Sequence, residues 1–135
     1  MIRMWAMNTK EIGNIGEGIA CKFLIKNNFT IVERNYLKKW GEIDIVATKD
    51  RALYFFEVKS MTVKRNGWEG MSRDRFRAEE NVHIQKQRRL KRAIGSYLAE
   101  RRYGPDTEFL FSVVVVHMDM KTRRGRVSLI ENVIL

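Results

Sequence analysis

The segment 109–116 constrains the fold of this chain more than any other. Its sequence, FLFSVVVV, is apolar apart from Ser112. A strand reads as an unbroken apolar run when both of its faces are covered, whereas a strand with one face in water alternates between apolar and polar residues. The segment therefore predicts a central strand in a sheet that is covered on both sides.

Two helices and four further strands follow from hydrophobic periodicity and turn signals. Asn8 and Glu11 fit an N-cap and capping-box pair at the start of a helix. Three strand-like segments separated by short turns predict an antiparallel meander. The predicted elements are a helix over 8–28, strands over 29–37, 42–47 and 52–59, a helix over 82–102, and strands over 109–116 and, at an edge, 127–134. This order, αβββαββ, predicts an α/β protein with a mixed central sheet of about five strands flanked by helices.

The length of 135 residues suits a single domain over 1–135. Within it we expect a flexible leader over 1–7 and a long basic loop over 61–81. No apolar stretch is long enough to cross a bilayer, and no signal peptide is recognised. Cys21 is the only cysteine, which excludes a disulfide framework and a cysteine-based metal site. We therefore expect a cytoplasmic protein without a membrane partner.

The charge of the chain is positive and concentrated in one segment. The formal net charge is +10. Residues 59–102 hold 13 basic and 5 acidic side chains, a net charge of +8, and the rest of the chain contributes only +2. A basic region of this kind predicts an anionic partner, with nucleic acid ahead of an anionic membrane surface.

Asp44, Glu57 and Lys59 form the candidate site. Glu57 and Lys59 share a face of the third predicted strand, because side chains alternate along a strand. The turn at 49–51 can place Asp44 beside Glu57. Buried charges require a partner or a metal, and oxygen ligands suit Mg²⁺ or Mn²⁺, to which the backbone carbonyl of Val58 could add a ligand. A structural carboxylate–lysine ion pair is the alternative interpretation.

Glu17 lies on the first predicted helix between Gly16 and Gly18. Glycine weakens a helix by about 0.5–1 kcal/mol relative to alanine, so these glycines, with Gly13, indicate a close approach of another segment. Glu17 is then directed inward. An exposed glutamate on a frayed first turn is the alternative.

Several motifs, in their order along the chain, resemble those of the YraN family. This family of bacterial proteins is assigned to the PD-(D/E)xK nuclease superfamily and is similar to archaeal Holliday-junction resolvases. The resemblance covers about residues 13–116. The matching motifs are Gly16-Glu17-x-x-Ala20, Arg34-Asn35-Tyr36, Gly41-Glu42-Ile43-Asp44, Phe56-Glu57-Val58-Lys59, and Lys86-Gln87-Arg88-Arg89-Leu90 with Tyr97-Leu98.

The resemblance implies a restriction-endonuclease-like fold and a metal-dependent endonuclease acting on branched or structured DNA. It gives Glu17, Asp44, Glu57 and Lys59 the catalytic positions. Asp44, Glu57 and the Val58 carbonyl would hold Mg²⁺ or Mn²⁺, with Glu17 acting through water. Cleavage of a junction would require two symmetry-related sites and hence a homodimer. A nucleic-acid-binding accessory protein without turnover is the alternative function.

The second predicted helix carries the candidate DNA-binding residues, which are Lys86, Gln87, Arg88, Arg89, Lys91 and Arg92. The family commonly places a small residue and an arginine after its Glu-x-Lys motif, whereas Ser60 and Met61 stand here. Lys64 or Arg65 is therefore the candidate for that phosphate contact. The alternatives are a solvated basic helix face and, for Gln87, a buried amide bonded to the backbone.

Overall fold

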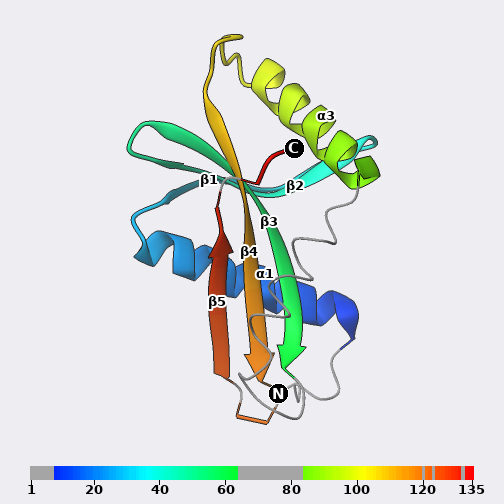
Figure 1. Ribbon diagram of the computed structural model, residues 1–135, viewed down its shortest axis with the longest axis vertical. Helices are drawn as coiled ribbons and strands as arrows, with labels where there is room; N and C mark the ends of the chain where they lie inside the picture. The colour runs from blue at the N-terminus through cyan, green and yellow to red at the C-terminus, as the bar shows by residue number, and fades with distance from the viewer. Residues whose placement is uncertain (1–7, 64–83, 120, 123, 132) are drawn as a thin grey trace.

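The sheet of this protein is mixed, with five strands in the order β1-β2-β3-β4-β5 (Figure 1). The computed structural model describes residues 8–63, 84–119, 121–122, 124–131 and 133–135. The elements are α1 (Thr9–Lys26), β1 (Thr30–Lys38), β2 (Gly41–Lys49), β3 (Ala52–Val63), α3 (Ile84–Glu100), β4 (Phe109–Asp119) and β5 (Arg124–Ile130). The α/β class and the order αβββαββ predicted from the sequence are confirmed.

Only β3 and β4 pair in parallel, and the other neighbouring strands are antiparallel. Parallel neighbours require a crossover connection, and α3 lies within the one between β3 and β4. The predicted meander corresponds to β1, β2 and β3. Strand β4 is buried from Phe111 to Met118 between two apolar clusters, which confirms that it is covered on both faces.

Helices α1 and α3 cover opposite faces of the sheet. Helix α1 begins at its predicted N-cap, where the backbone N–H of Glu11 donates to Asn8 Oδ1 at 2.8 Å. It packs mainly across β3 and β4 (Figure 1), whereas α3 packs on β2 and β1. Leu24 belongs to the α1-side cluster, and Tyr97 and Ile94 belong to the α3-side cluster.

Several predicted boundaries are wrong at their ends. Strand β3 continues to Val63, so residues 61–63 are not part of a loop. Their backbone pairs with β4 as far as Val63–Asp119. Strand β5 is Arg124–Ile130 rather than 127–134. Helix α3 ends at Glu100 rather than at residue 102. The predicted leader 1–7, loop residues 64–81 and helix residues 82–83 lie outside the described residues.

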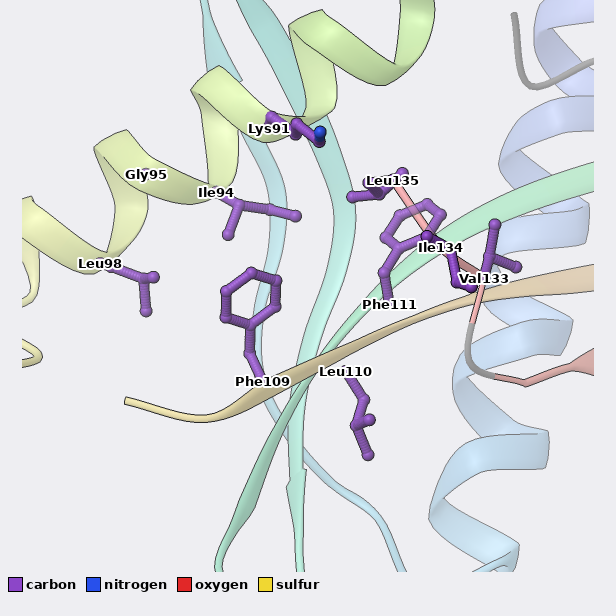
Figure 2. Close-up of a pocket in the computed structure, with 10 residues that line it drawn as sticks. All are labelled: Lys91, Ile94, Gly95, Leu98, Phe109, Leu110, Phe111, Val133, Ile134 and Leu135. Atoms are coloured by element: carbon purple, nitrogen blue, oxygen red, sulfur yellow. The ribbon is translucent and has the colours of Figure 1, made fainter. Parts of the chain in front are cut away.

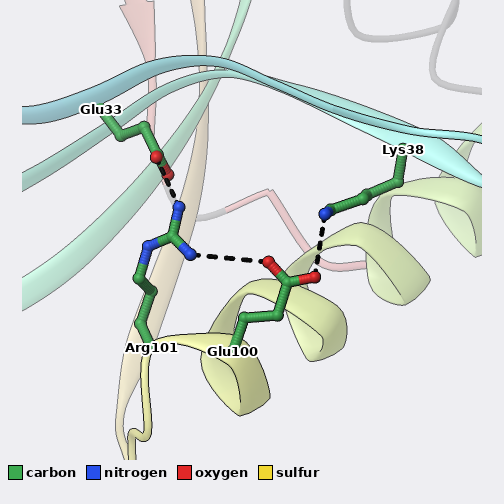
Figure 3. A network of polar contacts seen from close by, with 4 residues as sticks. All are labelled: Glu33, Lys38, Glu100 and Arg101. Atoms are coloured by element: carbon green, nitrogen blue, oxygen red, sulfur yellow. Dashed lines mark hydrogen bonds and ion pairs between the residues drawn. The ribbon is translucent and has the colours of Figure 1, made fainter.

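The β1–β2 hairpin is held against α3 at both of its ends. At the turn, a Cβ on Gly41 would lie 2.4 Å from the backbone oxygen of Arg89, so this position accepts only glycine without a shift of the backbone. At the other end of α3, Arg101 pairs with Glu33 on β1 at 2.5 Å (Figure 3). Glu100 pairs with Lys38 at 2.9 Å. The hairpin and α3 therefore form one unit beside the candidate site.

Candidate functional site

Strands β2 and β3 separate at the candidate site. Their ladder runs from Lys49–Ala52 to Ile45–Phe56. Beyond that pair β2 continues against β1, and β3 continues against β4 (Figure 1). We call this point the strand split. The next residues after the last pair are Asp44 and Glu57, so the predicted neighbours meet where the two strands part.

The Asp44 carboxylate bridges the strand split. The backbone N–H of Val58 donates to Asp44 Oδ2 at 2.7 Å. Burial raises the pKa of Asp44 from 3.8 to about 6, and the hydrogen bond from Val58 opposes this increase. The negative charges of Glu57, Glu42 and Glu17 raise the pKa further. Asp44 is therefore close enough to the other two predicted carboxylates to feel their charge.

Glu57 is a buried carboxylate on β3, only 8% exposed. One of its oxygens forms an ion pair with Lys86 at the start of α3. Its other oxygen, Oε2, is buried and has no hydrogen-bond partner among the described residues. A buried carboxylate oxygen without a partner is costly. It is the kind of atom that a divalent cation stabilises.

Glu17 reaches the site from α1 and is paired with Arg34 on β1. The Glu17 side chain is 13% exposed, and Arg34 Nη2 lies 3.3 Å from its Oε1. The helix approaches β3 closely because residue 16 is glycine: a Cβ there would lie 1.8 Å from Ser60 Oγ. Gly13 and Gly18 face open space, so the expected close approach exists only at Gly16.

Lys59 is half-buried on β3 and shares the strand face of Glu57. In the register with β4, Lys59 pairs with Val115 and Glu57 pairs with Val113, and both valines belong to the apolar cluster on the α3 side. The side chains of Lys59 and Glu57 therefore leave β3 on the same side of the sheet.

In the part of the chain that is described, no three His, Cys, Asp or Glu side chains are close enough to hold a metal ion. Glu57 is instead bound by Lys86, and Glu17 by Arg34. The donors nevertheless suit a hard divalent cation, because they are carboxylate oxygens. One of them, Glu57 Oε2, is buried and unpaired among the described residues, and it lies near Asp44, whose pKa is raised.

The basic side chains of helix α3 begin at the site and continue over an exposed surface. Lys86 lies at the site itself, and Gln87 is half-buried. The exposed residues Arg88, Arg89, Lys91 and Arg92 line an open hollow of about 510 Å³. Lys64 and Arg65 lie outside the described residues.

Sequence reasoning missed two partners at the site. It included Arg34 in a motif but gave it no role, and it assigned Lys86 to DNA without its bond to Glu57. The register Arg34–Ile45 places Arg34 beside the strand that carries Asp44, so the motif and this register together could have indicated it.

A second hollow, also of about 510 Å³, lies between α3, the start of β4 and the last residues of the chain (Figure 2). Its lining is apolar except for Lys91 and comprises Lys91, Ile94, Gly95, Leu98, Phe109, Leu110, Phe111, Val133, Ile134 and Leu135. None of the predicted catalytic residues lines it, so it is separate from the candidate site. Within the described part of the chain, no helix has both the length and the apolar character needed to cross a membrane.

The fold and the strand split together define a mixed α/β protein with carboxylates gathered where two strands of the sheet part. The chain matches the model of "Uncharacterised protein family UPF0102" over residues 16–130. The chain belongs to this family. UPF0102 is the YraN family, so the family resemblance predicted from the sequence motifs is confirmed.

Relatives in several bacteria match over most of their length. A UPF0102 protein of Caldicellulosiruptor saccharolyticus is 34% identical over 93% of this chain and 98% of the relative. One of Helicobacter hepaticus is 33% identical over 96% and 99%, respectively. One of Dictyoglomus turgidum is 40% identical over 71% and 74%. The residues that the family model matches, 16–130, include Asp44 and Glu57 at the strand split.

Proposed function

We propose that this protein is a metal-dependent endonuclease that hydrolyses phosphodiester bonds of branched or otherwise structured DNA. The observation that carries the proposal is the buried, half-unpaired Glu57 carboxylate next to Asp44 at the strand split, with the basic helix α3 starting at the same point. Such a cluster of carboxylates, with a raised pKa and a basic surface beside it, is typical of a functional site.

Asp44, Glu57 and the Val58 carbonyl would hold Mg²⁺ or Mn²⁺, and Glu17 would contribute through water. When bound, the cation supplies charge stabilisation and a water of lowered pKa. Lys59, on the face of Glu57, orients the attacking water or offsets the negative charge that develops on the phosphate. Lys86, which is bonded to Glu57, would be free to bind a phosphate oxygen if a cation took its place at the Glu57 carboxylate.

The remaining cations on α3 hold the DNA backbone. Arg88, Arg89, Lys91 and Arg92 are exposed, line one hollow, and continue from Lys86. Gln87 adds an amide next to them. Contacts of this kind supply affinity without reading sequence, and they weaken as salt is added. Cleavage of a four-way junction would further require two copies of the site in a homodimer.

The test compares cleavage with binding. Purified protein is incubated with labelled four-way junction, flap and duplex DNA in Mg²⁺ or Mn²⁺. We expect the parent to cut at least one structured substrate, and Asp44→Asn and Glu57→Gln to abolish cleavage while they still bind DNA in EDTA. Cleavage by both variants at the rate of the parent would show a contaminating nuclease and would refute the site.

A DNA-binding accessory protein without turnover is the second candidate. It is favoured by the ion pairs Glu57–Lys86 and Glu17–Arg34, which engage two of the carboxylates. Calorimetric titration of the protein with Mn²⁺, in the presence and in the absence of DNA, separates the two candidates. Binding that Asp44→Asn abolishes supports the nuclease. No binding under either condition supports the accessory protein.

A further inference from the structure

Trp40 is an exposed tryptophan at the turn of the β1–β2 hairpin, 39% exposed. With Arg92 and Ser96 of α3 it lines a hollow of about 330 Å³ between the hairpin and the helix. Tryptophan is on average among the more buried residues, because exposing its ring forgoes much apolar burial. A flat aromatic surface is thus left open beside an arginine.

The position of Trp40 is fixed by its neighbours. The following residue, Gly41, is buried against the backbone of Arg89, so the turn is in direct contact with α3. Two residues before Trp40, Lys38 is bonded to Glu100 at 2.9 Å. A turn whose backbone is already held in place loses little entropy when a ligand stacks on its aromatic ring.

A basic track connects Trp40 to the candidate site. Lys86 contacts Glu57, and Arg89 and Arg92 follow at intervals of three residues along α3. At 1.5 Å per residue, Arg92 lies about 9 Å along the helix from Lys86. On the hairpin, Trp40 lies four residues from Asp44, or about 13 Å along the strand. In a DNA duplex, which rises 3.4 Å per nucleotide, that span corresponds to about four nucleotides between the cleaved bond and the first unpaired base.

We propose that Trp40 stacks on an unpaired base of the DNA substrate, about four nucleotides from the phosphodiester that is cleaved. This inference rests on the proposed function and specifies its substrate class. Arg92 lines the same hollow. It binds the neighbouring phosphate and adds a cation–π contact with the stacked base. Bases inside a continuous duplex are stacked on each other and offer no free face, so Trp40 selects forks, flaps and other DNA with a single-stranded segment.

Equilibrium binding in EDTA tests this selection. The probes are a forked DNA with single-stranded arms and a blunt duplex. We expect Trp40→Ala to weaken binding of the fork by about 5- to 100-fold, the range found for loss of one stacked aromatic, and binding of the duplex by less than about twofold. Trp40→Phe retains most of the affinity because it keeps a ring. Leu37→Ala, at a 71% exposed apolar residue of the same hairpin, is the matched control and changes neither.

Two further measurements separate stacking from a loss of charge or of fold. The dependence of fork binding on salt keeps its slope in Trp40→Ala, because no phosphate contact is removed. In the variant Trp5→Phe/Trp68→Phe, Trp40 is the only tryptophan. Its fluorescence is quenched on addition of the fork, with the same midpoint as binding.

Each outcome decides the inference. Equal losses on fork and duplex, no loss on the fork, or unquenched Trp40 fluorescence in the bound complex each overturn the stacking role and leave the proposed function standing. A parent protein that binds neither probe overturns the proposed function and this inference together.

Discussion

Lys86, at the start of α3, forms an ion pair with Glu57 in the middle of β3. The pair joins the basic helix to the carboxylates of the strand split. Glu57 is buried, so its carboxylate needs a nearby cation, and this lysine supplies one. The candidate phosphate-binding helix and the candidate metal site are therefore coupled through one contact.

Removal of the Lys86 charge is expected to destabilise the protein in EDTA. Lys86→Met leaves the Glu57 carboxylate buried without a cation, which we expect to lower the free energy of unfolding by about 1–3 kcal/mol. Urea denaturation measures the change, with Lys91→Met, an exposed lysine of the same helix, as the control. Under the proposed function, Mn²⁺ restores part of the lost stability. Equal stability of the two variants would contradict the importance of the pair.

The raised pKa of Asp44 predicts a pH-dependent gain in stability for Asp44→Asn. Because the pKa is about 6 in the folded protein and 3.8 as the ordinary value, the folded state holds the proton more tightly. The stabilisation that comes from protonated Asp44 is complete below pH 3.8 and is lost as the pH rises through 6. Ionised Asp44 thus costs about 3 kcal/mol above pH 7.

Asparagine still accepts the hydrogen bond from Val58 and carries no charge. We expect Asp44→Asn to raise Tm by roughly 5–10 °C at pH 8 in EDTA, by about half as much at pH 5, and to change it little below pH 3.8. Asp50→Asn serves as the control, because it makes the same chemical change at a solvent-exposed residue of the β2–β3 turn. A gain at pH 5 as large as at pH 8 would rule out titration of Asp44 as the cause.

The contact between Gly16 and Ser60 predicts opposite effects for two neighbouring glycines. Gly16→Ala places a methyl group against Ser60 Oγ and should destabilise by about 1–3 kcal/mol. Gly18→Ala meets nothing within 4 Å and should stabilise by about 0.5–1 kcal/mol. Thermal and urea unfolding check both. Recovery of stability in Gly16→Ala/Ser60→Gly identifies the steric contact, and a failure to recover would assign the loss elsewhere.

Replacement of arginines on α3 is expected to change the salt dependence of DNA binding. Arg88→Ala or Arg89→Ala should each reduce the slope of log K against log salt concentration by about 0.9, the value for one phosphate contact. Fluorescence anisotropy measures DNA binding by each variant at salt concentrations from about 50 to 300 mM NaCl, which gives the slope. Arg51→Ala, at the exposed turn after β2, leaves the slope unchanged. Parallel lines for every variant would exclude phosphate contacts from α3.

Much of the fold follows from local sequence. The apolar run of β4, the N-cap of α1 at Asn8 and the short turns of the meander each reflect nearest-neighbour physics, so the order of elements and the covered central strand are correct. The ends of β3 and β5 were not predictable from local sequence, because the length of a hydrogen-bonded ladder depends on how far the partner strand extends. Strand β3 continues through Ser60, Met61 and Thr62 to Val63 because β4 runs beside it.

The sequence by itself determined which residues carry charge and that Asp44 and Glu57 lie on neighbouring strands. Only the tertiary structure decided that the strands part there, that Glu57 bonds Lys86 and Glu17 bonds Arg34, and that Trp40 lies against α3. The reason is physical. Periodicity encodes the face on which a side chain lies, whereas its partner depends on the twist and separation of strands, which segments far apart in the chain set together.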